Sequence, residues 1–427
     1  MEEIYEEWDI YAQKKELKQR DIDFNLLINT SKLKIIAITG IRRSGKTSLL
    51  ILLRQILEKR NEKVRYINLE DSRIKDKKEI LDDILSWFGD SGYLLLDEIT
   101  CVDDWAGWLS RSHEMLKGKL KIIVSSSRKG LAVPSKPLRG RILTQELYPL
   151  SFNEFLQFNN IKLEKTMISR GKIRRALDEY LILGGFPEIV LINNKTDKIS
   201  VSNSYFRDII GLDVAEISRE NISVVELFGK YIIDTAYFSA SKCLNFFKTL
   251  GYKIGKQSIL NLEKNSQESY LFFFVPIFSY NIKDRSQYPR KAYLGDTGFM
   301  YSISGKKDMG RLFENSVFLE LKRRLSQNHE INYWKNKEGM ETDFIIREGM
   351  KIKEIIQVVY EIDDEKTKDR EIKGLISCAK EFKIKKGTII TKEYEAVETV
   401  DEIKIEFIPL WKWLLKNDKN SNVIGYV

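Results

Sequence analysis

Short apolar runs alternate with amphipathic segments through the first 146 residues. Each run is short enough to be a buried strand, and helical patterns separate one run from the next. The runs are Lys34–Thr39, Val64–Leu69, Tyr93–Leu96, Lys121–Val124 and Ile142–Glu146. Because strands alternate with helices, the pattern predicts an α/β domain over residues 1–146.

The loop after the first strand fits the phosphate-binding P-loop pattern G-x-x-x-x-G-K-[ST]. Gly40 and Gly45 allow backbone N–H groups to point at phosphate oxygens, and the following helix N-terminus favours an anion. Lys46 would reach the β- and γ-phosphates, and the Thr47 hydroxyl would bind Mg²⁺. The alternative is a Gly-rich turn before an ordinary helix. The predicted ATP contacts are Gly40, Ile41, Arg42, Arg43, Ser44, Gly45, Lys46, Thr47 and Ser48.

Two carboxylates follow the strand Tyr93–Leu96 in the Walker B pattern. Asp97 would hold Mg²⁺, and Glu98 would orient and deprotonate the attacking water. The alternative is a buried strand that ends in a solvated acidic turn. The nearby P-loop favours the catalytic interpretation.

Two further side chains are candidates for the same site. Ser125–Ser127 follow the strand Lys121–Val124, and a hydroxyl there could sense the γ-phosphate, although serines at strand ends also form ordinary turns. Arg141 could stabilise transition-state charge, or it could be a surface arginine in a basic loop. If Arg141 acts in trans, the protein is a homo-oligomer.

Residues 147–200 are predicted to form a helical lid. Ser151 and Glu154 have the spacing of a capping box at the start of a helix. Helical patterns continue to Leu183, where Gly184–Pro187 breaks the chain sharply.

Residues 201–296 resemble a winged helix-turn-helix domain. Two helical patterns precede a third over Lys256–Tyr270, and the strand Leu271–Tyr280 then pairs with Ala292–Leu294 in a hairpin with a basic tip. Charged and amide side chains on the third helix and the wing are types that contact DNA. The alternative is a protein–protein spacer, because fold does not fix function. The candidate DNA contacts are Lys256, Gln257, Lys264, Arg285, Arg290 and Lys291.

Residues 297–427 resemble the PD-(D/E)xK nuclease core in the order of their predicted elements. The resemblance assigns a second metal site to Glu314, Asp343 and Gln357. The family's catalytic lysine would fall two residues after Gln357, where this chain has Val359. Without that cation the water is not activated, so we expect a nuclease-like fold that cuts poorly or not at all. The alternative treats the carboxylates as helix-surface and turn residues.

Composition adds little to this picture. The net charge of +9 suits an anionic partner such as DNA, and the apolar runs are too short to cross a bilayer. The chain has 3 cysteines without C-x-x-C spacing and 2 histidines, which argues against a His/Cys metal site. We expect no signal peptide and a cytoplasmic location.

The motifs together resemble the AAA+-type prokaryotic ATPases, frequent in archaea, that carry a C-terminal winged-helix and restriction-endonuclease-like region of unknown function. The resemblance spans nearly the whole chain and implies ATP binding and hydrolysis. It assigns the sensor role to Ser126, although Ser125 replaces the usual glycine before it. The matching segments are Gly40–Thr47, Asn68–Asp71, Leu96–Glu98, Gly140–Arg141, Leu147–Phe155, Gly184–Glu188, Tyr293–Gly298, Phe313–Asn315, Glu341–Phe344 and Pro409–Leu414.

Three functions follow from these features. The first is an ATPase whose nucleotide state controls a DNA-facing C-terminal region. The second is an active ATP-regulated nuclease, against which Val359 argues. The third is a signalling or assembly switch whose C-terminal domains bind proteins. Only a binding measurement separates the first from the third.

Overall fold

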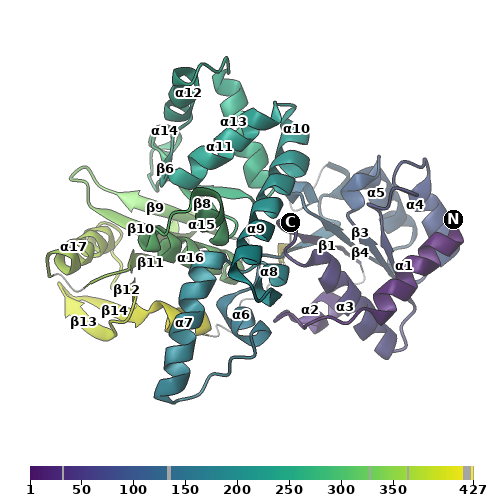
Figure 1. Cartoon of the computed structure of the whole chain (residues 1–427), viewed down its shortest axis with the longest axis horizontal. Helices are drawn as coiled ribbons and strands as arrows, with labels where there is room; N and C mark the ends of the chain where they lie inside the picture. Colours follow the sequence, from purple (N-terminus) through teal and green to yellow (C-terminus); the bar gives the residue numbers. More distant parts are fainter. Residues whose placement is uncertain (31–32, 132–135, 327, 363–364, 417–424, 427) are drawn as a thin grey trace. The chain divides into compact units, whose positions relative to one another are not determined.

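The computed structural model describes residues 1–30, 33–131, 136–326, 328–362, 365–416 and 425–426. The chain divides into two compact units, whose elements are labelled in Figure 1. Unit 1 comprises Met1–Pro149, Glu268–Tyr270 and Asn422–Val427, and unit 2 comprises Leu150–Gln267 and Leu271–Ser421. Within the described ranges, no helix is long and apolar enough to span a membrane.

Unit 1 is built on a six-stranded sheet with the strand order β15-β5-β1-β4-β3-β2. The five predicted strands are present and pair in parallel, whereas β15 is antiparallel to β5. β1 lies between β5 and β4, and the loop that follows it lies at the carboxyl edge of these parallel strands. Sheets of this kind bind ligands at that edge. The strands are β1 (Ile35–Thr39), β2 (Val64–Asn68), β3 (Gly92–Asp97), β4 (Leu120–Ser126), β5 (Ile142–Glu146) and β15 (Gly425–Tyr426).

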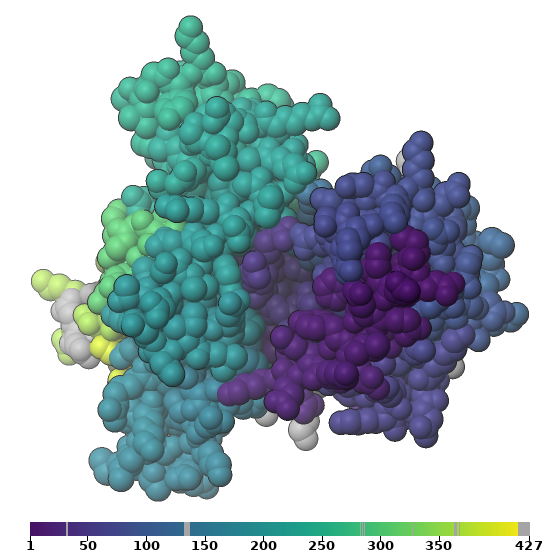
Figure 2. Space-filling view, turned by 45° about the vertical axis from the view of Figure 1, so that its right-hand side comes forward, coloured from purple at the N-terminus to yellow at the C-terminus, as the bar shows by residue number. Residues whose placement is uncertain are grey.

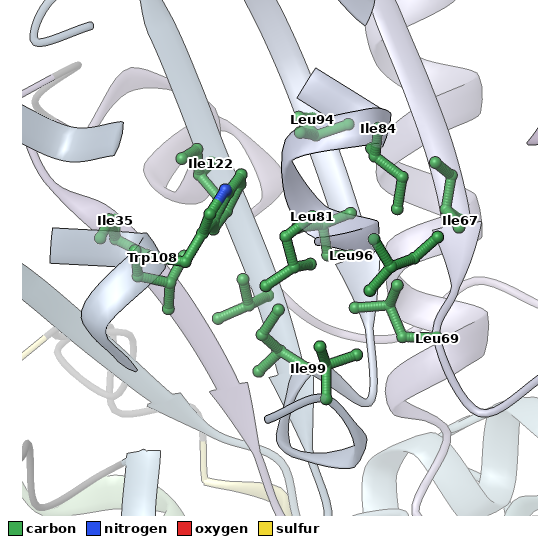
Figure 3. Close-up of a cluster of buried hydrophobic side chains, with 14 of the residues drawn as sticks. Ile35, Ile67, Leu69, Leu81, Ile84, Leu94, Leu96, Ile99, Trp108 and Ile122 are labelled. Atoms are coloured by element: carbon green, nitrogen blue, oxygen red, sulfur yellow. The ribbon is translucent and has the colours of Figure 1, made fainter. Parts of the chain in front are cut away.

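The sheet of unit 1 is buried on both faces. Ile35 and Ala37 of β1 belong to the apolar cluster of Figure 3, to which α4 and α5 contribute Leu81, Ile84 and Trp108. The intervening residues of β1 belong to a second cluster with α3. Alternating side chains point to opposite faces, so a strand covered on both sides must be apolar throughout. The helices are α1 (Glu2–Lys14), α2 (Phe24–Asn29), α3 (Lys46–Lys59), α4 (Ile80–Phe88) and α5 (Trp105–Met115), with short 3₁₀ turns at Ile99–Cys101, Lys129–Leu131 and Lys136–Leu138.

Unit 2 begins with a helical region, as predicted. The capping box of the first helix is present: the Glu154 amide donates to Ser151 Oγ at 3.2 Å, and the Ser151 amide donates to the Glu154 carboxylate at 2.8 Å. The helices are α6 (Phe152–Phe158), α7 (Met167–Leu183), α8 (Pro187–Leu191), α9 (Lys195–Asp208), a π-helix at Ile209–Ala215, α10 (Glu216–Ser218) and α11 (Ile222–Asp234).

The break after α7 is held by a carboxylate from a distant part of unit 2. Asp296 accepts hydrogen bonds from the amides of Gly185 at 2.8 Å and Gly298 at 2.9 Å. At Gly184, with φ of 81°, a Cβ atom would lie 1.7 Å from the Asp296 carboxylate, so only glycine fits there. Burial raises the pKa of Asp296 to about 6, although the two glycine amides oppose this rise.

The predicted winged-helix region combines several helices with a small antiparallel sheet of order β6-β8-β7. β7 and β8 pair antiparallel, as the predicted hairpin requires, and part of the basic segment between them forms the helix α14. This region forms the teal and green surface at the top of Figure 2. Its further elements are β6 (Tyr237–Phe238), α12 (Ala240–Thr249), α13 (Lys256–Glu268), β7 (Phe272–Val275), α14 (Ile282–Gln287) and β8 (Arg290–Leu294).

The C-terminal part of unit 2 contains a mixed six-stranded sheet of order β13-β14-β12-β11-β10-β9. β9, β10 and β11 pair antiparallel, β11, β12 and β14 pair in parallel, and β13 returns antiparallel to β14. The strands are β9 (His329–Lys335), β10 (Glu341–Glu348), β11 (Lys351–Val359), β12 (Lys386–Thr391), β13 (Ala396–Val400) and β14 (Ile403–Pro409). The helices are α15 (Gly298–Ser304), α16 (Met309–Arg324), α17 (Glu365–Glu381) and α18 (Leu410–Leu415).

Candidate functional site

The loop between β1 and α3 has the tight backbone that a phosphate cradle requires. Gly45 precedes α3 with φ of 99°, in the left-handed region that glycine tolerates. At Gly40 a Cβ atom would lie 2.0 Å from the carbonyl oxygen of Leu147. Both glycines of the motif are therefore required by the backbone, one by its conformation and the other by a close approach.

Lys46 is the first residue of α3, and its side chain is buried. Its ammonium donates to the carbonyl oxygens of Gly40 at 3.1 Å and Ile41 at 3.3 Å. The same Nζ lies 3.5 Å from Glu98 Oε1. The structure thus brings together the lysine and the proposed base, which are 52 positions apart in the sequence.

Asp97 ends β3 and is fully buried. Its Oδ2 accepts from the Tyr66 hydroxyl at 2.9 Å, and its Oδ1 accepts from Ser125 Oγ. Burial raises the pKa of Asp97, as does the charge of Glu98, while hydrogen bonds from Ser125, Thr47 and Tyr66 oppose the rise. Thr47 and Asp97 therefore lie within hydrogen-bonding reach, and their hydroxyl and carboxylate oxygens suit Mg²⁺.

Glu98 is held in an unusual backbone conformation, with φ of 51°. Its amide donates to Ser125 Oγ at 2.9 Å, and its Oε2 accepts from the Ser127 amide at 3.1 Å. Left-handed conformations of residues other than glycine are costly and cluster at functional sites. The end of β4 therefore fixes both the backbone and the carboxylate of Glu98.

Within the part of the chain that the structure describes, the Ser126 hydroxyl forms no hydrogen bond with the carboxylate of Asp97 or of Glu98. Its hydroxyl pairs with Thr100 Oγ1 at 2.8 Å and accepts from the Arg128 amide at 3.0 Å. Ser125, one of the three serines considered for this role but not the one to which the family resemblance assigned it, is the serine that contacts Asp97 and Glu98. Successive residues of a strand face opposite sides, which separates the two hydroxyls.

Arg141 lies at the opposite edge of the sheet from the P-loop. Its carbonyl accepts from the Ile35 amide at the start of β1, whereas the P-loop follows the end of that strand. Five strand residues separate the two edges by roughly 16 Å. The guanidinium pairs instead with Glu114, at 2.8 Å. The prediction that Arg141 stabilises transition-state charge is thus wrong for the site of its own chain. Its action on the site of another subunit stays a prediction.

Arg20 supports the P-loop, a role that was not predicted from the sequence. Its buried guanidinium donates to the carbonyl oxygens of Ser44 at 2.7 Å and Tyr148 at 3.0 Å. Arg20 thus links the phosphate loop to the segment after β5. No sequence motif surrounds Arg20, so only the fold reveals this contact.

Glu314 and Asp343, two residues of the predicted second metal site, meet in unit 2 around a lysine, together with Glu341, which was not predicted as a ligand. The Lys291 ammonium lies 3.0 Å from Glu314, 2.8 Å from Glu341 and 2.6 Å from Asp343. Gln357 lies beside this group, but its Oε1 accepts from the Asp343 amide at 3.1 Å. The prediction of Lys291 as a DNA contact is wrong, because its side chain is buried in this cluster.

The other candidate DNA contacts differ in their exposure. Lys256, Gln257 and Lys264 are exposed on α13, and Arg285 is half-buried on α14. Arg290 is also half-buried and forms an ion pair with Glu263 of α13. The surface available to a partner is therefore centred on α13 rather than on the predicted hairpin.

Comparison with known proteins agrees with the chemistry of unit 1. A family model described as an AAA domain matches residues 32–156, the range that contains the P-loop, Asp97 and Glu98. Two models of domains of unknown function match residues 174–310 and 309–413. The parallel sheet, the P-loop and the AAA match together define a P-loop AAA+ ATPase domain.

The chain belongs to the family of an uncharacterized protein of Methanocaldococcus jannaschii. The two are 35% identical over 422 residues, which cover 95% of this chain and 92% of that protein. An uncharacterized protein of Haemophilus influenzae is 25% identical over 390 residues, covering 88% of this chain and 93% of its own.

The matched solved structures are more distant. A DNA replication initiation factor is 15% identical, with a TM-score of 0.29, and the match covers 57% of this chain and 91% of that chain. AMPPCP-bound DnaA from Aquifex aeolicus is 17% identical, with a TM-score of 0.26, and covers 57% of this chain and 85% of its own. The assignment of unit 1 therefore rests on the AAA domain match and on its own sheet and site.

Proposed function

We propose that this protein binds ATP with Mg²⁺ and hydrolyses it, and that its nucleotide state controls a DNA-binding region in unit 2. The observation that carries the first part is the convergence of Lys46, Thr47, Asp97 and Glu98 at the carboxyl edge of one parallel sheet. P-loop enzymes use a lysine, a hydroxyl and two carboxylates in this way.

Each of these residues has a distinct task in the proposed reaction. The loop amides and Lys46 bind the β- and γ-phosphates, and Thr47 and Asp97 supply the oxygen ligands that fit Mg²⁺. When bound, Mg²⁺ neutralises phosphate charge that develops during transfer. Glu98 orients the attacking water and accepts its proton.

The contact between Lys46 and Glu98 gives nucleotide binding a direct effect on the base. A γ-phosphate competes with Glu98 for the Lys46 ammonium, which lies 3.5 Å from the carboxylate. Release from Lys46 leaves Glu98 able to accept a proton, while the Ser127 amide still holds its other oxygen. The base is thus freed when a substrate is present.

The test compares Lys46→Ala with Glu98→Gln. Lys46→Ala should abolish binding of a fluorescent ATP analogue, whereas Glu98→Gln should bind it and lose phosphate release. Lys59→Ala, at the exposed end of the same helix, is the matched control and should resemble the wild type. Hydrolysis by Glu98→Gln at the wild-type rate would move the base elsewhere and reject the assignment.

For the remainder of the chain we propose a helical lid over 147–200, a winged helix-turn-helix over 201–296 and a nuclease-like domain over 297–427, after the ATPase core of 1–146. DNA would contact the exposed face of α13 through Lys256, Gln257 and Lys264, with Arg285 beside it. The net charge of +9 supports an anionic partner.

Salt dependence tests the DNA proposal. Phosphate contacts release counterions, so DNA affinity should fall steeply as salt rises. Replacing Lys256 and Lys264 together by alanine should flatten that slope, whereas replacing Lys172 and Arg175 of α7 should not change it. An absence of DNA binding at low salt would favour the alternative, a switch that binds protein partners.

The nuclease-like domain is proposed not to cut DNA. Val359 replaces the expected lysine and is buried in the apolar cluster that includes Ile372 and Leu375 of α17. A charge at that position would be desolvated rather than directed at a phosphate. Plasmid incubated with wild type in Mg²⁺ or Mn²⁺ should stay intact. Cutting that Asp343→Ala abolishes would instead establish the alternative, an ATP-regulated nuclease.

A further inference from the structure

We propose that Lys291 is a built-in cation: its ammonium occupies the place among the carboxylates of Glu314, Glu341 and Asp343 that a divalent metal would take, and so keeps metal out. The inference deepens the proposed nuclease-like role of unit 2 and rests on it. It concerns only residues within that unit.

The geometry around the ammonium is complete without any further ligand. Nζ has three N–H donors. Three carboxylate oxygens lie within 3.0 Å of it, one each from Glu314, Glu341 and Asp343. Glu314 comes from α16 and the two others from the start of β10, so the lysine on β8 joins three elements.

The carboxylates are themselves held in place. The Tyr293 hydroxyl donates to Glu314 at 2.6 Å, and the Tyr237 hydroxyl donates to Glu341. The second oxygen of Asp343 accepts from the Val358 amide at 2.8 Å. Each acid therefore presents one fixed oxygen to the ammonium, the arrangement that a site uses to orient its ligands.

Burial explains why this lysine needs so many acidic partners. Lys291 is only 5% exposed, and a buried charge without partners would be costly. Burial by itself lowers the pKa of the Lys291 ammonium, but Asp343, Glu314 and Glu341 raise it well above its ordinary value. The rings of Tyr237 and Tyr333, each 5.8 Å from Nζ, add further attraction for a cation.

The ammonium neutralises the carboxylates as a metal would, but it differs chemically from one. It cannot accept a water as a ligand and lower the pKa of that water, which is how a metal generates a nucleophile. Lys291 thus preserves the carboxylate cluster while removing its hydrolytic chemistry.

Binding of Mn²⁺ to the full-length chain without nucleotide tests this proposal. The measurement is the number of bound ions per chain at pH 8, counted by electron paramagnetic resonance. Wild type and Asp343→Asn should bind equal numbers. Lys291→Met, which keeps the length of the side chain but not its charge, should gain one ion, and the double variant Lys291→Met/Asp343→Asn should lose it again.

The matched control is Lys335→Met. Lys335 contacts the other oxygen of Glu341, at 3.2 Å, from the exposed side, so its loss should leave the ion count unchanged. A wild-type ion that disappears in Asp343→Asn would overturn the proposal, even if Lys291→Met does not fold. A folded Lys291→Met that gains no ion would also overturn it. The number of bound ions does not depend on ATP hydrolysis. A failure of the ATPase proposal would therefore appear in the phosphate-release assay and would leave the ion count unchanged.

Discussion

At the scale of single residues, Ser125 links the carboxylate of Asp97 to the backbone amide of Glu98. Its hydroxyl donates to Asp97 and accepts from the Glu98 amide. Ser125→Ala removes a hydrogen bond to the buried carboxylate of Asp97, at a cost of about 1–3 kcal/mol. We predict that kcat for ATP hydrolysis falls by roughly 10-fold or more, since 1.4 kcal/mol corresponds to tenfold.

Ser126→Ala is the internal comparison for this prediction. Its hydroxyl contacts Thr100 and the Arg128 amide, so the variant should retain most of the hydrolysis rate. Steady-state phosphate release by both variants shows which of the two serines contributes to hydrolysis. The reverse order of effects would return the sensor role to Ser126.

Asp296 gives a residue-scale prediction about pH. Burial raises its pKa from 3.8 to about 6 in the folded chain. Because the folded value is the higher one, the folded state binds the proton more tightly. This stabilisation is complete below pH 3.8 and is lost as the pH rises through 6. The shift corresponds to about 3 kcal/mol at 1.36 kcal/mol per unit.

The comparison with Asp296→Asn isolates this effect. Asparagine does not titrate, so the unfolding free energy of wild type minus that of the variant should decrease as the pH rises from about 4 through 6 and should level off above about pH 7. Urea unfolding at four pH values measures it. A difference that grows with pH would mean that Asp296 has a lowered pKa instead.

At the scale of elements, the P-loop depends on an arginine that does not belong to it. Arg20 binds the carbonyl oxygens of Ser44 and Tyr148 and so fixes the loop against the chain after β5. We predict that Arg20→Ala weakens ATP binding by about 10-fold, or 1.4 kcal/mol, because hydrogen bonds from charged donors contribute about that much.

Isothermal titration with an ATP analogue measures this change. Arg60→Ala removes another arginine contact, to Asn25 on the exposed surface of unit 1, and should not alter affinity. If both variants lowered ATP affinity equally, the role of Arg20 would be to stabilise unit 1 in general and not the P-loop in particular.

At the scale of the whole molecule, Arg141 raises the question of assembly. Its position at the far edge of the sheet separates it from the P-loop of its own chain. We therefore predict that it acts on the site of a neighbouring subunit, where an arginine of this kind contributes on the order of 10³ in rate.

Mixing two inactive variants tests action in trans. Arg141→Ala retains its own site, and Glu98→Gln retains its arginine, so mixed oligomers should recover hydrolysis that neither variant shows alone. Full hydrolysis by Arg141→Ala by itself would remove the arginine from the mechanism, and a monomer at all concentrations would exclude the trans arrangement.

The sequence by itself determined the features that depend on neighbours within one segment. The P-loop, the two acids at the end of β3, the five strands and the capping box at Ser151 all follow from patterns shorter than ten residues. Such patterns are reliable because backbone conformation and strand burial are set by local periodicity. The acids Glu314 and Asp343 were also found from the order of elements around them.

Tertiary structure alone decided which side chains meet across long separations. Lys291 carries the charge expected of a DNA contact, yet the fold buries it against Asp343, 52 positions later. Arg20 and Ser125 gained their partners in the same way, and Arg141 was separated from the site by the direction of β5. A charged or hydroxyl side chain takes its role from the groups that desolvate and pair with it, and only the folded chain brings those groups together.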